Sequence, residues 1–217
     1  MHKFDYPIFA REGRVHLLLI LVLAALATWL WGFWSWPIWL LALFVLQFFR
    51  DPKRRISEAP GDVVAPASGK VVFIGEADCP YLAEEPKMRK ISIFMNVFSV
   101  HSNLIPVGGV IKGCEYHQGS FLNAALDKAS EQNERNAIWI RTAASEDVVS
   151  VQIAGLVARR ILCYVRSGDQ VQTGQRYGFI RFGSRVDLYL PMEAEMKTTL
   201  GQWVTSGNDV LANLHTR

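Results

Sequence analysis

The feature that most constrains this chain of 217 residues is one long apolar run. Residues 15–49 contain no Asp, Glu, Lys or Arg. A single straight helix of that length would be about 52 Å long at about 1.5 Å per residue. The hydrocarbon core of a bilayer is only about 30 Å thick. The run is therefore too long for one pass, and we predict two helical segments.

A natural break lies near the middle of this run. Residues 32–37 include a glycine and a proline, and five of the seven tryptophans lie between residues 29 and 39. Because tryptophan collects at membrane interfaces, the turn is expected at the far interface. We predict a helical membrane hairpin in which residues 15–31 enter and residues 38–49 return. The second arm is short, so a re-entrant arm stays open. A secretory signal peptide fits less well, because no small-residue cleavage site follows.

Charge is distributed unevenly along the chain. Residues 1–55 carry a net charge of +4, whereas residues 56–217 carry a net charge of −1. Basic residues on both sides of the apolar run predict that both of its ends lie on the cytoplasmic side. The rest of the chain has no basic excess to attract nucleic acid. It also lacks a zinc-ligand spacing, a P-loop and a GxGxxG motif. Three scattered cysteines fit a reducing compartment.

The sequence predicts three parts: an anchor over residues 1–50, a polar linker with two prolines over residues 51–61, and a domain over residues 62–217. The domain contains short runs rich in Val, Ile and aromatic residues, which predict a mainly β (α+β) sandwich or barrel. The best helix candidate is 123–133. The expected strands are 63–64, 70–74, 90–94, 107–111, 137–142, 148–153, 159–164, 177–181 and 186–189.

Two stretches of the domain, residues 64–72 and 165–175, read as related half-units. The second has the pattern V-x-x-G-D-x-V-x-x-G-Q. This pattern is similar to that of hammerhead barrels of the lipoyl and biotinyl type, in which the glycines permit tight bends. No lysine stands at the hairpin tip to carry a prosthetic group, so the pattern indicates a fold and not an activity.

The pair Gly183-Ser184 lies between two apolar runs. Such a pair is most often a simple bend. It also permits a reaction, because Gly183 has no side chain to shield its carbonyl from the hydroxyl of Ser184. An N-to-O acyl shift followed by β-elimination would cut the chain and leave residue 184 as an N-terminal pyruvoyl group.

Several longer motifs, in order, resemble the short, pyruvoyl-dependent bacterial phosphatidylserine decarboxylase proenzymes. The resemblance implies a bacterial inner-membrane enzyme whose catalytic domain lies on the cytoplasmic face. It also implies self-cleavage into a β chain, 1–183, and an α chain, 184–217, which stay together as a heterodimer; a higher oligomer stays open. The motifs are residues 91–101, 119–124, 127–130, 133–136, 151–160 and 177–185.

The resemblance further implies the reaction. The pyruvoyl group derived from Ser184 would form a Schiff base with the amine of phosphatidylserine and accept the electrons released with carbon dioxide, as pyridoxal phosphate does. The product would be phosphatidylethanolamine, in phospholipid biosynthesis. No metal or external cofactor is expected, because the chain makes the group from its own backbone.

The resemblance assigns His101 as the general base that takes the proton of the Ser184 hydroxyl. The family usually has an aspartate where this chain has Ser68, and that aspartate would orient the histidine as in a serine-protease triad. Ser68 supplies no charge, so slower maturation is expected. Asp62 or a bound water remain open as replacements, and a plain turn residue is the other interpretation of Asp62.

Polar residues in family-like motifs are candidates for the substrate pocket, and solvated surface positions are their alternative interpretation: Asn123, Asp127, Asn133, Glu134 and Arg135. An alternative function from another class is a non-enzymatic, membrane-tethered hammerhead barrel that binds a partner protein. The two functions differ at Ser184, because the enzyme must be cut there and the adaptor stays whole.

Overall fold

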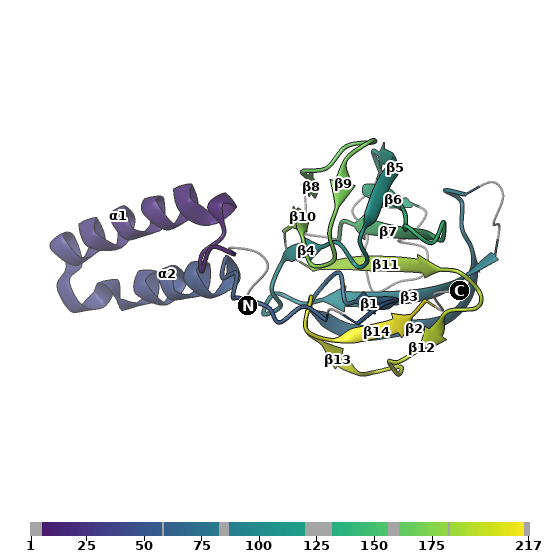
Figure 1. Ribbon diagram of the computed structural model, residues 1–217. Coiled ribbons are helices and arrows are strands. Elements are labelled where there is room, and N and C mark those ends of the chain that lie inside the picture. Colours follow the sequence, from purple (N-terminus) through teal and green to yellow (C-terminus); the bar gives the residue numbers. More distant parts are fainter. Residues whose placement is uncertain are drawn as a thin grey trace. The chain divides into compact units, whose positions relative to one another are not determined.

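A computed structural model describes residues 6–57, 59–82, 87–119, 132–155, 161–181 and 183–214. The chain forms two compact units, one helical and one rich in strands (Figure 1). The helical unit ends at Lys53 and the second unit begins at Arg54, so the boundary falls within residues 51–61.

The helical unit is a hairpin. It consists of η1 (Arg11–Gly13), α1 (Arg14–Trp31), η2 (Gly32–Ser35) and α2 (Trp36–Phe48). Gly32 adopts a φ of +56°, which favours glycine, and Pro37 lies in the first turn of α2, where its missing N–H costs no helical hydrogen bond. The chain therefore turns where the glycine and the proline predicted it.

Polar groups hold both ends of the hairpin. At the turn, Trp39 Nε1 donates to Thr28 Oγ1 at 3.0 Å. At the other end, the backbone N–H of Ala10 donates to the carbonyl of Phe49 at 2.7 Å. The backbone N–H of Asp51 donates to the carbonyl of Ile8 at 2.8 Å. The segments that enter and leave the hairpin consequently lie side by side.

The hairpin buries several small side chains between its helices and exposes many large apolar ones, although Phe48 and Phe49 at its base are buried. Ala24, Ala27 and Ala42 are buried, whereas Trp29 and Phe33 are 80% and 82% exposed. Small residues at the contact let two helices approach closely, as in membrane helix pairs. The most apolar 18-residue stretch of the segment Arg11–Phe48 has a mean hydropathy of 2.2, and by length and composition the segment can cross a membrane.

The second unit is mainly β and is built on a curled eight-stranded antiparallel sheet, with the strand order β13-β2-β3-β11-β7-β6-β5-β9. Two three-stranded sheets, β1-β14-β12 and β4-β10-β8, complete it. The strands are β1 (Asp62–Val64), β2 (Gly69–Asp78), β3 (Lys87–Met95), β4 (Ser102–Leu104), β5 (Gly109–His117), β6 (Arg135–Arg141), β7 (Asp147–Ile153), β8 (Ile161–Cys163), β9 (Gln170–Val171), β10 (Arg176–Ile180), β11 (Ser184–Leu190), β12 (Glu195–Met196), β13 (Trp203–Val204) and β14 (Val210–Asn213).

The predicted fold class is therefore confirmed. Each predicted strand overlaps an observed one, although the run 107–111 starts its strand two residues later, at Gly109. Five short strands, β4, β9, β12, β13 and β14, were not predicted. The predicted helix 123–133 lies almost entirely outside the described residues.

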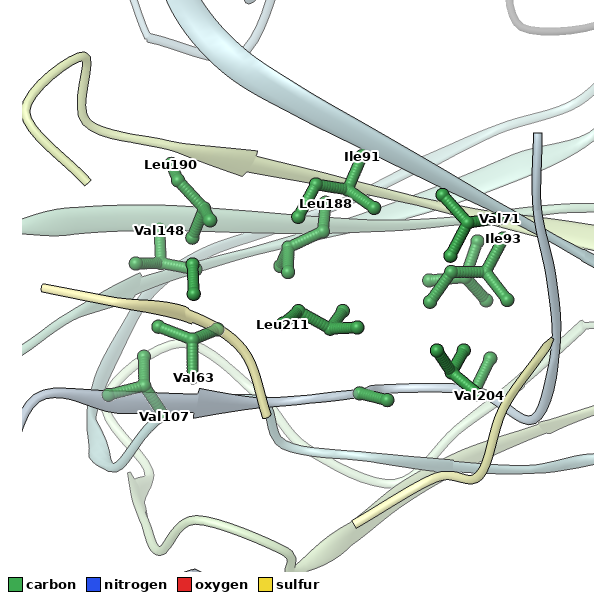
Figure 2. Packing of buried hydrophobic residues seen from close by; sticks show 14 of the residues in the cluster. Val63, Val71, Ile91, Ile93, Val107, Val148, Leu188, Leu190, Val204 and Leu211 are labelled. Atoms are coloured by element: carbon green, nitrogen blue, oxygen red, sulfur yellow. The ribbon is translucent and has the colours of Figure 1, made fainter. Parts of the chain in front are cut away.

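The main core lies between the large sheet and the β1-β14 pair. Figure 2 shows Ile91 and Leu188 of the sheet facing Val63 and Leu211 of that pair. Alternate residues of β11 face the other way, where Tyr189 belongs to a second apolar cluster. Both faces of the sheet are covered, which explains why all seven residues of β11 are buried.

The glycines of the two half-units adopt special conformations or allow close contacts. In the second half-unit, Gly168 and Gly174 have φ values of +93° and +82°. The backbone N–H of Arg166 donates to Asp169 Oδ2 at 2.8 Å and closes the Gly-Asp turn between β8 and β9. In the first half-unit, a side chain at Gly69 would overlap the carbonyl of Phe94. Gly168 and Gly174 therefore permit the bends that the pattern predicted, and the close contact at Gly69 was not predicted.

Candidate functional site

Ser184 is the first residue of β11 and lies directly opposite Met95, the last residue of β3. Ser184 is fully buried, and its Oγ donates to the Met95 Sδ at 3.4 Å. Gly183, just before it, has a φ of +59°, which favours glycine. Nothing lies within 4 Å of the position that a Gly183 Cβ would take. Glycine is therefore required here by its backbone conformation and not by crowding.

His101 is fully buried and lies between β3 and β4. The backbone N–H of Ile180 donates to its carbonyl at 3.2 Å, and its ring centroid is 6.3 Å from that of Phe179. These contacts hold His101 against Phe179 and Ile180 at the end of β10. Ile180 is three residues before Gly183.

Two strand pairings bracket the segments that carry His101 and Gly183. Met95 pairs with Ser184, and Ser102 pairs with Phe179. His101 therefore follows Met95, and Gly183 precedes Ser184, between the same two pairings. The fold brings the histidine and the Gly-Ser pair into one buried region, although they are more than 80 residues apart in sequence.

A buried arginine is also part of this region. Arg54 Nη2 donates to Ser102 Oγ at 2.9 Å, and Arg54 is only 2% exposed. In the sequence, Arg54 is one of the basic residues that flank the apolar run. Its burial beside the neighbour of His101 became visible only in the folded structure, because no local pattern links positions 54 and 102.

Ser68 and Asp62 each have identified partners. Ser68 Oγ donates to Ser206 Oγ at 3.0 Å and accepts the Ser206 backbone N–H at 2.9 Å. Asp62 Oδ2 accepts the Ser57 hydroxyl, and its Oδ1 accepts Asn213 Nδ2 at 2.9 Å and lies 3.2 Å from Lys197 Nζ. The hydrogen bond from Ser57 above all lowers the pKa of Asp62, and Asn213 and Lys197 add to this effect. Support of His101 by Ser68 or Asp62 stays a prediction.

Two of the predicted pocket residues lie at the same end of the sheet as Ser184. Ile153 pairs with Arg185, so the next residue, Ala154, lies beside Ser184. The Ala154 backbone N–H donates to the carbonyl of Glu134 at 2.9 Å, and Asn133 Nδ2 donates to the carbonyl of Ala154 at 2.7 Å. Two inter-strand steps place the Glu134 backbone roughly 10 Å from that of Ser184.

Both Asn133 and Glu134 are buried, so they are not solvated surface residues. Arg135 is half-buried and pairs with Ile153, one row further from Ser184. Asn123 and Asp127 lie outside the described residues.

The opposite face of β11 carries a buried group of charges that the sequence analysis did not identify. Asp187 Oδ1 lies 2.8 Å from Arg185 Nε, and its Oδ2 lies 2.9 Å from Lys90 Nζ. Burial, and next the negative charge of Asp187, raise the pKa of the nearby Tyr189 hydroxyl. The residues alternate along β11, so the charged side chains point away from the core face of Val186 and Leu188.

Within the ranges that the structure describes, no cluster of three or more His, Cys, Asp or Glu side chains is arranged to hold a metal ion. The buried groups around Ser184 include a histidine, a thioether and amides, together with the guanidinium of Arg54. A histidine near a buried hydroxyl suits proton transfer and nucleophilic attack by that hydroxyl.

Comparison with known proteins identifies relatives along nearly the whole chain. A family model described as phosphatidylserine decarboxylase matches residues 41–212. A protein of Burkholderia cenocepacia is 53% identical over 213 residues, which cover 98% of this chain and 99% of the relative. Proteins of Burkholderia multivorans and Burkholderia vietnamiensis are 53% and 52% identical with the same coverage. All three are named phosphatidylserine decarboxylase proenzyme. With a match of this length and identity, the chain belongs to the phosphatidylserine decarboxylase family.

Proposed function

We propose that this chain is a membrane-anchored phosphatidylserine decarboxylase proenzyme that cuts itself between Gly183 and Ser184. One observation carries the proposal: a glycine in the left-handed conformation directly precedes a fully buried serine at the start of a central strand. A buried hydroxyl next to a carbonyl that no side chain shields is placed to attack that carbonyl.

The cut follows from the chemistry of these two residues. Ser184 Oγ attacks the Gly183 carbonyl carbon, and the peptide bond to the Ser184 nitrogen is exchanged for an ester to Ser184 Oγ. Loss of the Ser184 Cα proton then expels Gly183 as a carboxylate and leaves a double bond at residue 184. A proton shift gives an imine, which takes up water and releases ammonia, so residue 184 becomes a pyruvoyl group.

His101 is the base in this proposal. It takes the proton from the Ser184 hydroxyl as the oxygen attacks, and its backbone carbonyl accepts the N–H of Ile180, three residues before Gly183. Its burial supports this role, because the ring is held away from solvent in the part of the fold that contains the buried Ser184 hydroxyl. Ser68, Asp62 or a bound water are the candidates that orient it.

The surroundings of residue 184 suit the group that the cut would create. When formed, a pyruvoyl group supplies an electron-withdrawing carbonyl that stabilises the carbon losing carbon dioxide. The chain contributes a buried position, a strand paired on both sides, and the neighbouring Asn133 and Glu134 as candidates for contacts with the phosphatidylserine headgroup. Asn123, Asp127 and Arg135 remain candidates on sequence grounds.

The two chains produced by the cut would remain together. The C-terminal piece contains β11, which is hydrogen-bonded to β3 and β7, and β14, which is hydrogen-bonded to β1. All of these partners belong to residues 1–183. Because β11 is entirely buried, separation would expose the core. We therefore expect a heterodimer of the two chains, held at the cytoplasmic face of the bacterial inner membrane by the hairpin.

The decisive experiment is the intact mass of the purified full-length protein. The proposal expects a fragment that begins at residue 184 and carries a blocked N-terminus, together with decarboxylation of phosphatidylserine in mixed detergent micelles. Ser184→Ala should abolish both the cut and the activity. An uncut wild-type chain would instead favour the adaptor function, and decarboxylation by Ser184→Ala would exclude the pyruvoyl mechanism.

A further inference from the structure

The hydroxyl of Ser184 points to a methionine that is itself held in place. Met95 Sδ accepts Ser184 Oγ at 3.4 Å and lies 3.9 Å from Asn103 Nδ2, which donates to the same sulfur. All three residues are fully buried. One thioether therefore contacts both the hydroxyl and a side-chain amide.

The amide of Asn103 is fixed by a row of further amides. Gln152 Nε2 donates to Asn103 Oδ1 at 2.9 Å, and Asn136 Nδ2 donates to Gln152 Oε1 at 3.1 Å. Cys114 Sγ lies 3.7 Å from Asn136 Oδ1 and 3.9 Å from Cys163 Sγ. The side-chain oxygens of Asn103 and Gln152 each accept from the next amide in the row. The row crosses from β4 to β7, β6 and β5, so its orientation is set by strands of two different sheets.

The core makes room for this row. A side chain at Gly178 would overlap Gln152 Nε2 and come within 2.6 Å of the carbonyl of Leu162. Burying an amide costs free energy unless its hydrogen bonds are made. A row of satisfied amides within an otherwise apolar core is also more rigid than apolar side chains of the same size. Since apolar packing alone would stabilise the fold, the row suggests a role in placing another group.

We propose that Met95 is a positioning residue, held by Asn103 and Gln152, which fixes the Ser184 hydroxyl in the orientation from which it attacks Gly183. This inference rests on the proposed self-cleavage. A serine side chain has three staggered orientations, and a fixed acceptor selects one of them. Sulfur suits this role because it is a weak acceptor. It orients the hydroxyl without competing strongly with His101 for the proton.

Met95→Leu tests the inference directly, because leucine nearly conserves volume but offers no acceptor. We expect the first-order rate of cutting to fall roughly 3- to 10-fold, as expected when one favoured orientation and a weak hydrogen bond are lost. Met88→Leu is the matched control: Met88 is also fully buried in β3, but it lies in the second apolar cluster. It should cut at the wild-type rate.

Hydroxylamine separates positioning from a merely structural effect. It cleaves the ester between Gly183 and Ser184, so in excess hydroxylamine the rate of cutting reports ester formation alone. Met95→Leu should stay slow under these conditions, because its defect precedes the ester. Cutting of Met95→Leu at the wild-type rate in hydroxylamine would place the defect later and overturn the inference.

Gln152→Met tests the amide row, because it removes the donor to Asn103 at a distance from Ser184. It should also slow ester formation, and the double variant with Met95→Leu should be no slower than Met95→Leu alone. Slowing by the product of the two single effects would overturn the claim that the amides act through Met95.

The same assay tests the proposed self-cleavage and the positioning role of Met95 separately. If the wild-type chain stays uncut with and without hydroxylamine, as Ser184→Ala should, the proposed function fails. If the wild-type chain is cut and Met95→Leu is cut equally fast, the proposed function stands and the positioning role is wrong.

Discussion

The helical hairpin and the β unit differ in which side chains they bury and which they expose. The hairpin encloses alanines and leaves Trp29 and Phe33 outside, whereas the β unit encloses Val, Ile and Leu together with amides, serines and a histidine. A surface of leucine and tryptophan is stable in lipid and unfavourable in water. A buried polar group is tolerated only where its partners are built in. The comparison shows that the hairpin has an apolar surface suited to lipid. The β unit instead holds hydrogen-bonded polar groups in its interior, away from water.

The largest expected difference between the two units is in the rate of self-cleavage after one histidine of each is replaced. His101→Ala should slow self-cleavage by about 100- to 10,000-fold, the usual contribution of a general base. His16→Ala removes an exposed histidine of α1 that stacks on Phe49 with centroids 5.4 Å apart, and it should leave the cutting rate unchanged. Time courses of cleavage on denaturing gels measure both. Equal rates for His101→Ala and the wild type would remove His101 from the mechanism.

The next largest expected difference is in the free energy of unfolding after one leucine of each unit is replaced by alanine. Leu188→Ala in the main core should reduce the free energy of unfolding of the β unit by about 2–5 kcal/mol. Leu19→Ala in α1, where Leu19 is 64% exposed, should leave that free energy unchanged and weaken partition into vesicles. Denaturant unfolding of the detergent-solubilised protein and vesicle flotation test the pair. If both variants lowered unfolding stability equally, the contrast between the units would be wrong.

A moderate effect concerns the two thiols of the β unit that lie 3.9 Å apart, Cys114 and Cys163. A hydrogen bond from Cys114 lowers the pKa of Cys163 to about 6, and the same contact raises the pKa of Cys114. Alkylation of Cys163 by iodoacetamide should therefore rise with pH to a half-maximum near the value of about 6. Mapping the modified peptide by mass spectrometry measures this rate.

Two variants complete this thiol experiment. Cys114→Ala should move the half-maximum of Cys163 alkylation to higher pH, because the donor that favours the thiolate is lost. Cys79, which is buried, should remain unmodified in the folded protein. An unchanged pH profile in Cys114→Ala would contradict the assigned contact.

The smallest effect concerns Asp62, whose pKa is lowered by Ser57, Asn213 and Lys197. A carboxyl whose pKa is lower in the folded state contributes stability above its unfolded pKa, near 4, and loses it as the pH falls through the folded value. The melting temperature of Asp62→Asn should therefore depend less on pH than that of the wild type below about pH 4. Parallel melting curves across this range would show that Asp62 does not contribute. Because Lys197 is partly exposed, we expect only a small difference.

Local patterns predicted much of the fold. The glycine and proline near the middle of the apolar run predicted the hairpin turn, and runs of β-branched residues predicted most strands. The short strands β12 and β13 were not predicted, because two residues carry no alternation of apolar and polar side chains. They exist because neighbouring strands pair with them.

The residues around Ser184 also divide into those that the sequence predicted and those that only the structure revealed. Gly183 and Ser184 were predicted as the cleavage site because they adjoin in sequence and lie within motifs that resemble the family. Met95, Asn103 and Gln152 were missed, because each reads as an ordinary member of a strand. Their common feature is contact between strands that are far apart along the chain, which no sequence pattern expresses.

The sequence by itself determined which segment is apolar enough for a membrane, the strand-rich character of the rest, and the residue pair at which the chain is expected to cut itself. These properties depend on composition, on periodicity and on adjacent residues. Only the tertiary structure decided that Ser184 faces Met95, that His101 is hydrogen-bonded to Ile180 just before the Gly-Ser pair, and that a row of amides contacts Met95. Strand pairing sets these contacts, because its register joins residues without regard to their distance along the chain.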